Sequence, residues 1–223
     1  MPDKTTSESL LLRYEDNQLI RALIQLVPFG AGGALDALLV GTLDDIRRGR
    51  SAAFFDELAA EGTLISDEDI QSEDFLHKYF TTVKAALNTR RREKIVMFAK
   101  LLKSSTVDDS VSDVDVYEDF LSILDELTFR ELRALSILEE YSERPRRNDQ
   151  NDLQWTTTFW DDFEAQVARE LGLPNEEVPD FMNRIVRTGC YEMFTGGFMD
   201  YTGGKGKLTP TFRRLQALIQ KTG

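Results

Sequence analysis

The chain has 223 residues, of which 41% are hydrophobic and 30% charged, so it is long enough to bury one large core or two small ones and is too apolar for bulk disorder. Its 27 basic and 39 acidic residues give a formal net charge of -12, which disfavours polyanionic partners unless the charge is unevenly distributed. The single cysteine excludes an intramolecular disulfide, and the N-terminal residues lack the basic start and apolar run of a signal peptide. We therefore predict a cytoplasmic protein.

The first distinctive segment is the apolar stretch over residues 19–41. It is long enough for a transmembrane helix, which needs about 20 apolar residues. However, Arg21 and Asp36 would be costly in a bilayer, and a proline and several glycines interrupt any helix near its centre. We predict a buried hairpin of two helices, over residues 17–27 and 34–48, and keep membrane insertion as an alternative.

Further helices are predicted across the rest of the first half. One covers residues 51–61 and ends at Gly62, and the next follows Ser72, which has the side chain of an N-cap. Behind Ser72, apolar residues recur at a spacing of 3.6, and a further helix continues to Leu102. The polar segment over residues 104–115 is expected to be a solvated loop. These patterns predict an α-helical bundle over residues 1–127.

The second half begins with another helix signal. Thr128 and Glu131 match a capping box, in which each side chain accepts a hydrogen bond from the other residue's backbone amide. The helix that follows leads into a polar loop over residues 143–154. We assign residues 128–223 to a single module, with this loop inside it.

The end of the chain combines two helices with glycine-rich turns. Phe159, Phe163, Val167 and Leu171 recur every four residues before Gly172, and Asn175 is then expected to cap a second helix that Pro179 makes irregular at its start. The glycines between residues 195 and 206 supply the positive φ angles of a β-hairpin. Thr209 and Pro210 have the residue types of the N-cap and first position of a closing helix.

This order resembles the winged-helix family, a helix-turn-helix with a β-hairpin wing. Many bacterial winged-helix regulators carry an "ELGL"-type helix end and an "LTP"-type entry after the wing, which here are residues 170–173 and 208–210. The resemblance covers residues 128–223. It implies a winged-helix-like α+β module with one β-hairpin. Together with the α-helical bundle predicted before it, the expected fold class is mainly α.

Basic residues gather at the positions where a winged helix would contact DNA. The residues that could contact nucleic acid or another anionic partner are Arg184, Arg187, Lys205, Lys207, Arg213 and Arg214. Glu176, Glu177 and Asp180 stand at the start of the same candidate recognition helix, where they would repel phosphates. Winged helices also serve in protein contacts, so the resemblance leaves both uses open.

The first half is similar to a group of poorly characterised bacterial helical proteins. The similarity rests on the turn LVPFGAGGALDALL, the FFDEL and SEDFLHKYF helices and the segment TRRREKIVMFAKLL, within residues 19–102. Some members of that group are linked to phage defence or toxin systems. The resemblance assigns no catalytic residue.

Catalytic and metal sites are not expected from the residues present. His77 is the single histidine and is expected on the polar side of its helix, and Cys190 is expected to be a small buried residue. The glycine-rich segments lack the spacing of a P-loop or a dinucleotide fingerprint. We therefore predict a non-enzymatic protein with no catalytic residue, no metal site and no cofactor.

One further basic cluster, formed by Arg90, Arg91, Arg92 and Lys94, is a candidate docking patch for an anionic surface. A solvated turn is the other interpretation of the same four residues.

Three functions follow from these observations. The first is a cytoplasmic adaptor or regulatory protein that acts through contacts with a protein partner or with further copies of itself. The second is a transcriptional regulator that binds DNA through the C-terminal module, although the net charge disfavours it. The third is a membrane-acting defence effector that inserts residues 19–41, which the interrupted apolar segment disfavours.

Overall fold

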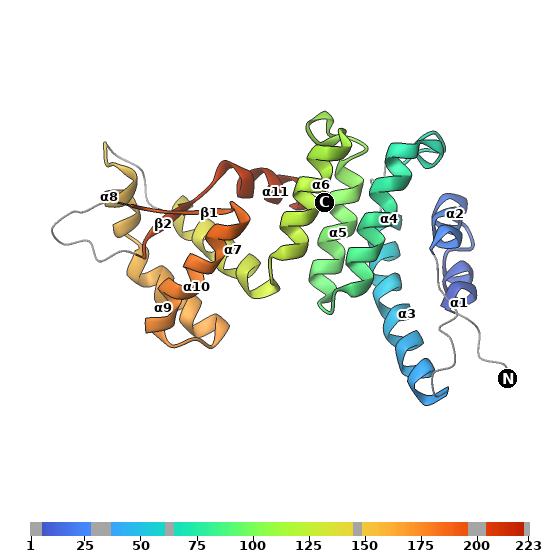
Figure 1. Ribbon diagram of the computed structural model, residues 1–223, viewed down its shortest axis with the longest axis horizontal. Helices are drawn as coiled ribbons and strands as arrows, with labels where there is room; N and C mark the ends of the chain where they lie inside the picture. The colour runs from blue at the N-terminus through green and yellow to red at the C-terminus, as the bar shows by residue number, and fades with distance from the viewer. Residues whose placement is uncertain (1–5, 28–36, 61–64, 145–148, 196–203, 221–223) are drawn as a thin grey trace. The chain divides into compact units, whose positions relative to one another are not determined.

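The computed structural model describes residues 6–27, 37–60, 65–144, 149–195 and 204–220, with the side chains of residues 37–44 left aside (Figure 1). Internal contacts divide the chain into two compact units, one of residues 1–122 with 218–223 and the other of residues 123–217. Helices dominate both, and the described strands form one antiparallel pair. The predicted fold class, an α-helical body with a β-hairpin near the C-terminus, is confirmed.

The first unit is built from helices, which Figure 1 shows from blue to green. In chain order its elements are α1 (Thr6–Arg13), α2 (Gln18–Leu26), α3 (Ala37–Ala59), a 3₁₀ turn at Asp69–Gln71, α4 (Glu73–Asn88), α5 (Arg92–Ser104), a 3₁₀ turn at Asp109–Val111 and α6 (Val114–Glu126), whose last residues belong to the second unit. The helices α3, α4 and α5 pack on one another and enclose the core. Its largest fully buried side chains include Phe54, Phe55, Tyr79 and Phe98.

Two helices of this unit begin at the residues predicted from the sequence. The Asn17 side chain accepts a hydrogen bond from the amide of Ile20 at 3.0 Å, and the Ser72 hydroxyl accepts one from the amide of Phe75 at 3.4 Å. Each contact satisfies an amide that has no partner within its helix, which is worth about 1 kcal/mol. The turn that joins the predicted helical hairpin, residues 28–36, lies outside the described residues, as does Gly62.

Helix α3 differs from the prediction of two helices over residues 34–48 and 51–61. It runs without interruption from Ala37 to Ala59, through Gly49. Glycine inside a helix costs about 1 kcal/mol relative to alanine. The burial of Phe54, Phe55 and Leu58 behind it outweighs that cost, since each such side chain contributes about 1.5–3 kcal/mol.

The segment over residues 104–115 is also not the solvated loop that we expected. Ser104 is the last residue of α5, and its hydroxyl donates a hydrogen bond to the carbonyl of Leu218 at 2.6 Å. Val111 is completely buried. A single valine therefore anchors a polar segment to the core. The polar composition of the segment did not indicate that this valine is buried.

The second unit consists of short helices and the β-hairpin. Its elements are α7 (Phe129–Glu143), α8 (Asp152–Thr157), α9 (Trp160–Leu171), a 3₁₀ turn at Asn175–Glu177, α10 (Val178–Ile185), a 3₁₀ turn at Val186–Thr188, β1 (Tyr191–Met193), β2 (Gly206–Leu208) and α11 (Pro210–Gln220), whose last residues are assigned to the first unit (Figure 1). In the hairpin, Tyr191 lies opposite Leu208 and Met193 opposite Gly206. The residues that join the two strands, 196–203, lie outside the described ranges. Trp160, Phe163, Met182 and Ile185 are buried in the core of this unit.

Three predicted caps of the second unit are confirmed, those at Thr128, Gly172 and Thr209. The Thr128 hydroxyl accepts a hydrogen bond from the amide of Glu131 at 3.2 Å, and the Glu131 carboxylate accepts one from the amide of Thr128 at 2.8 Å. Gly172 ends α9 with φ of 63°, a left-handed conformation in which glycine pays no steric cost. Thr209 accepts a hydrogen bond from the amide of Phe212 at 3.3 Å before α11 begins at Pro210.

The start of α10 corrects the prediction that Asn175 caps it. Asn175 opens a 3₁₀ turn and has no capping hydrogen bond, and α10 itself begins at Val178 with Pro179 in its first turn. A proline is tolerated there because amides of the first turn need no partner within the helix. Glu176 and Glu177 consequently precede the helix.

None of the helices within the described ranges is long and apolar enough to span a bilayer. In α2, the first part of the apolar segment, Ile20, Leu23 and Ile24 are buried.

Candidate functional site

Arg187, one of the six predicted contact residues, is held inside the second unit by two carboxylates. Its Nε atom lies 2.8 Å from Oε1 of Glu126, and its Nη1 and Nη2 atoms lie 2.8 Å and 3.1 Å from the two oxygens of Glu131. The side chain of Glu131 is almost fully buried, whereas that of Arg187 is 40% exposed. A paired, bidentate contact of this kind is among the stronger polar interactions in proteins. The guanidinium therefore joins the 3₁₀ turn after α10 to the start of α7.

The ionisation of Glu131 reflects these contacts. Burial disfavours its charged form, but hydrogen bonds from Arg187 and from the backbone and side chain of Thr128 outweigh burial, so that the pKa of Glu131 lies below its ordinary value. Glu131 therefore serves both the cap of α7 and the ion pair with Arg187.

Two other predicted residues, both lysines, lie at strand β2. Nζ of Lys207 lies 2.9 Å from a carboxylate oxygen of Asp152 and 3.5 Å from one of Glu192, and Nζ of Lys205 lies 3.4 Å from the hydroxyl of Thr157. The hydrogen bond with Asp152, with smaller contributions from the charges nearby, raises the pKa of Lys207. Lys207 thus connects the hairpin with α8.

The other three predicted residues are exposed arginines. The Arg184 guanidinium lies 5.1 Å from the centre of the Phe181 ring, a cation–π distance, and Arg130 lies 5.7 Å from the same ring. Arg213 and Arg214 are exposed on α11. Glu176 and Glu177 are exposed in the turn before α10, and Asp180 is exposed in the first turn of α10.

The four residues of the predicted basic docking patch do not share one environment. Arg90, Arg91 and Arg92 are exposed where α5 begins and, with Glu93, line a hollow of about 340 Å³. Lys94 is buried, and its Nζ lies 5.5 Å from the centre of the Phe98 ring. The exposed part of the patch is therefore the arginine triplet.

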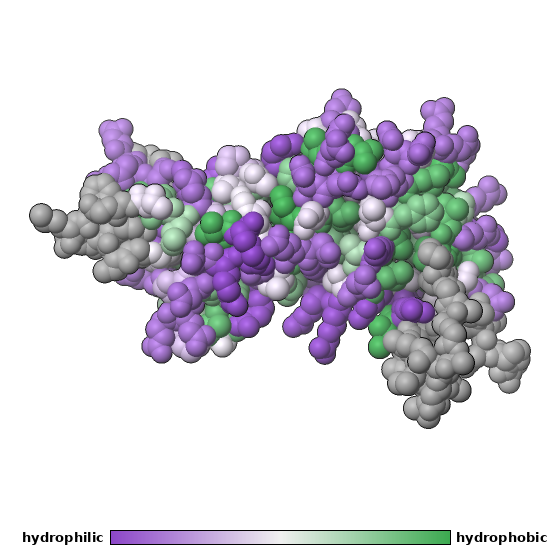
Figure 2. All heavy atoms as spheres, viewed as in Figure 1, coloured by the Kyte–Doolittle hydropathy of each residue, from purple (hydrophilic) through white to green (hydrophobic). Residues whose placement is uncertain are grey.

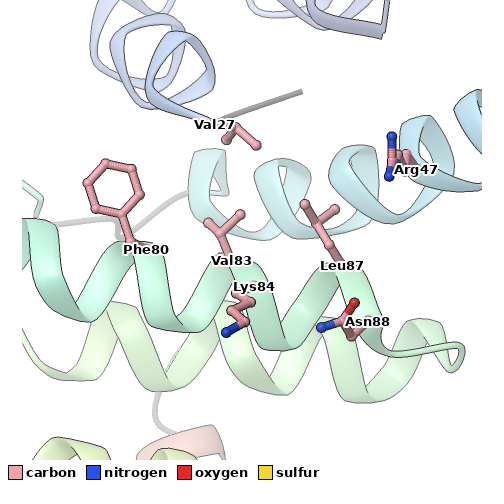
Figure 3. Close-up of a pocket in the computed structure, with 7 residues that line it drawn as sticks. All are labelled: Val27, Arg47, Phe80, Val83, Lys84, Leu87 and Asn88. Carbon is pink, nitrogen blue, oxygen red and sulfur yellow. The ribbon is translucent and has the colours of Figure 1, made fainter. Parts of the chain in front are cut away.

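Sequence reasoning missed a groove on the first unit. Its volume is about 400 Å³, and the described residues that line it are Val27, Arg47, Phe80, Val83, Lys84, Leu87 and Asn88. Figure 3 shows Phe80, Val83 and Leu87 pointing from α4 toward the side where α3 and Val27 lie, with Arg47 on α3. We call this site the α4 groove.

The α4 groove is mostly apolar, with cations at its rim. Val27 and Val83 are buried, whereas the Phe80 side chain remains 41% exposed although it is large and aromatic. Figure 2 shows apolar residues gathered on one face of the first unit, over α4 and the helices beside it. Exposed apolar surface of this kind commonly marks a binding site. The signal in the sequence was the spacing of Phe80, Val83 and Leu87, which belong to the apolar stripe predicted behind Ser72.

His77 and Cys190 lie in different environments. His77 is exposed, and its Nε2 atom lies 2.7 Å from a carboxylate oxygen of Glu118. Cys190 is completely buried, and burial raises the pKa of its thiol. No group of three or more residues that could ligate a metal occurs in the part of the chain that the structure describes.

We expect Cys190 to react slowly with a thiol reagent such as a nitrophenyl disulfide in the folded protein. The thiolate is the nucleophile in this reaction. The raised pKa lowers the fraction of thiolate, and burial keeps the reagent away from the sulfur. The rate should rise on the order of a hundredfold or more in denaturant, because the native thiol reacts only after local opening. Equal rates in the two conditions would contradict the buried position.

No protein-family model matches the chain, and neither a curated protein nor a solved structure matches it.

Proposed function

We propose that this protein is a non-enzymatic, cytoplasmic adaptor or regulatory protein that acts through protein contacts. The observation that carries the proposal is that Arg187 and Lys207 each form ion pairs with carboxylates of the second unit. They are two of the six basic residues that were predicted to contact DNA or another anionic partner. A phosphate that bound Arg187 would compete with Glu126 and Glu131 for the same guanidinium. Loss of the Glu131 contact would leave an almost fully buried carboxylate without its partner, which is strongly destabilising. The exposed α4 groove adds a surface of the kind that partners cover.

We also propose that residues 128–223 form a winged-helix-like module. The succession of α7, α9, α10, the β-hairpin and α11 supports it, because it follows the element order of that family. In this proposal the module is used for docking or structure, and the acidic residues before α10 favour a partner other than a polyanion.

A DNA-binding regulator is the second candidate, because the side chains of Arg184, Arg213 and Arg214 are exposed. The test is a gel-shift assay with mixed-sequence duplex DNA at low and at physiological salt. We expect no shift that survives physiological salt, since a surface with few available cations loses its weak attraction as salt rises.

The informative variant for this assay is the triple change Arg184→Glu, Arg213→Glu and Arg214→Glu. It leaves the ion pairs of Arg187 and Lys207 in place. A shift at physiological salt that this variant abolishes would favour the DNA-binding regulator and contradict our proposal.

The protein partner itself is tested by affinity purification of the full chain, followed by light scattering on the eluted complex. We expect a complex of fixed stoichiometry with a second protein or with further copies of this chain. A monomer that elutes alone from native extracts would count against the proposed function.

A further inference from the structure

Helix α4 presents a second face in addition to the one that builds the core. Phe75, Tyr79 and Ala86 are buried in the first unit. Phe80, Val83, Lys84 and Leu87 follow the spacing i, i+3, i+4, i+7 and line the α4 groove together with Asn88. Side chains at this spacing form the ridges and grooves with which one helix packs against another.

The length of this face suits a short helical segment. At a rise of about 1.5 Å per residue, the distance along α4 from Phe80 to Leu87 is roughly 10 Å, or two helical turns. The groove has a buried floor of Val27 and Val83, and its walls include the exposed Phe80 ring. Two or three leucine-like side chains at helical spacing would therefore fill it, as in other complexes where an amphipathic helix lies in a groove.

The charges around the groove define which helix would fit. Arg47 and Lys84 are both exposed, and the described lining residues include no carboxylate. This local excess of positive charge occurs in a chain whose net charge is -12. An acidic side chain at the rim would be attracted by both cations, whereas a basic one would be repelled.

We propose that the α4 groove binds an amphipathic helix of a protein partner, with its apolar side chains against Phe80, Val83 and Leu87 and a carboxylate beside Arg47 and Lys84. This inference rests on the proposed function, since it identifies the chemistry of the partner that the function requires. A small apolar anion is the competing occupant, and a second copy of the chain is another.

The direct test uses three synthetic fluorescein-labelled peptides and the full chain, with binding followed by fluorescence anisotropy. The first peptide has leucine at i, i+3, i+4 and i+7 positions and glutamate on the flanks of that stripe. The second has lysine in place of every glutamate, and the third has the composition of the first in an order without helical spacing. We expect the first to bind about tenfold more tightly than either control.

The variant that makes the test specific is the double change Arg47→Glu and Lys84→Glu, which should reverse the preference in favour of the lysine peptide. The control is Arg90→Glu with Arg92→Glu, which changes the net charge of the same unit equally and should leave the preference unchanged. A second variant, Phe80→Ala, should weaken the binding of both the glutamate peptide and the lysine peptide. Circular dichroism on each variant confirms that it is folded.

Several results would overturn the inference. Equal binding of the acidic and lysine peptides would show an apolar surface without charge selection, and no binding of any peptide would exclude a helix as the occupant. Tight binding of decanoate together with no peptide binding would assign the groove to a small anion. Dimerisation of the wild type that the double variant abolishes would assign it to a second copy.

The affinity purification separates this inference from the proposed function. If the double variant captures the same partner in the same amount as the wild type, the inference fails and the proposed function stands. If the wild type captures no partner at all, the proposed function fails. Capture by the wild type that the double variant loses and the control variant retains would support both.

Discussion

Replacing Phe163 by alanine is expected to lower the free energy of unfolding of the second unit by about 3–5 kcal/mol, the usual cost of removing a buried phenylalanine. Phe163 is completely buried on α9. Its ring centre lies 4.8 Å from that of Trp160 and 6.3 Å from that of Tyr141, which meets it edge-on. The change would remove the apolar burial and both ring contacts, and would leave a cavity between α9 and α7.

Urea denaturation followed by tryptophan fluorescence measures this effect. The chain has two tryptophans, Trp155 and Trp160, and both belong to the second unit, so the signal reports that unit. The matched control is Val186→Ala, since Val186 is 39% exposed and its truncation should change stability by no more than about 0.5 kcal/mol. A loss for Phe163→Ala as small as that of the control would contradict the buried position of α9.

Replacing Arg187 by alanine is expected to cost about 2–3 kcal/mol. Removal of one partner from a buried ion pair costs about 3–5 kcal/mol, and the figure is reduced here because Arg187 is itself 40% exposed. Glu131 would keep its place in the cap of α7 but lose both guanidinium hydrogen bonds. The control is Arg184→Ala, an exposed arginine three residues earlier in the chain without a described ion pair, for which we expect a much smaller loss.

The pH dependence of stability distinguishes an ion pair from simple packing. The pKa of Glu131 is lower in the folded protein than its ordinary value of 4.5, so its contribution is complete above 4.5 and is lost as the pH falls toward the folded pKa and below it. In Arg187→Ala the burial of Glu131 persists without its main partner, which moves the folded pKa upward.

The difference in unfolding free energy between the wild type and Arg187→Ala should therefore be largest near neutral pH and shrink in acid. Urea denaturation at pH 7 and at about pH 4 measures it. A difference that does not change with pH would mean that Arg187 stabilises the unit through packing of its stem and not through Glu131.

Much of the local structure could be predicted because it depends on neighbouring residues. Asn17, Ser72 and Thr128 cap the helices that follow them, and Gly172 ends α9, each through contacts within a few residues in the chain. The hairpin was predicted from the glycines that precede β2, and its register agrees with an antiparallel pair. These features need no knowledge of the tertiary structure.

The wrong predictions share a different cause. Gly49 lies within α3 instead of separating two helices, and Val111 is buried within a segment whose composition is polar. In both cases the packing of distant parts of the chain contributes more free energy than the local preference does. At Asn175 the local preference for a cap was overridden by a 3₁₀ turn before Val178.

The sequence by itself determined that the protein is mainly helical, where most helices begin and which residues carry the positive charge of the C-terminal module. Only the tertiary structure decided how that charge is used, because Arg187 pairs with carboxylates that are distant in the chain. Glu126 and Glu131 are both more than 50 residues from it, and Glu131 is 56 residues away. The α4 groove likewise depends on residues from α3, α4 and the end of α2. Capping and periodicity arise between neighbours along the chain, whereas ion pairs and grooves arise between residues that meet only after the helices have packed.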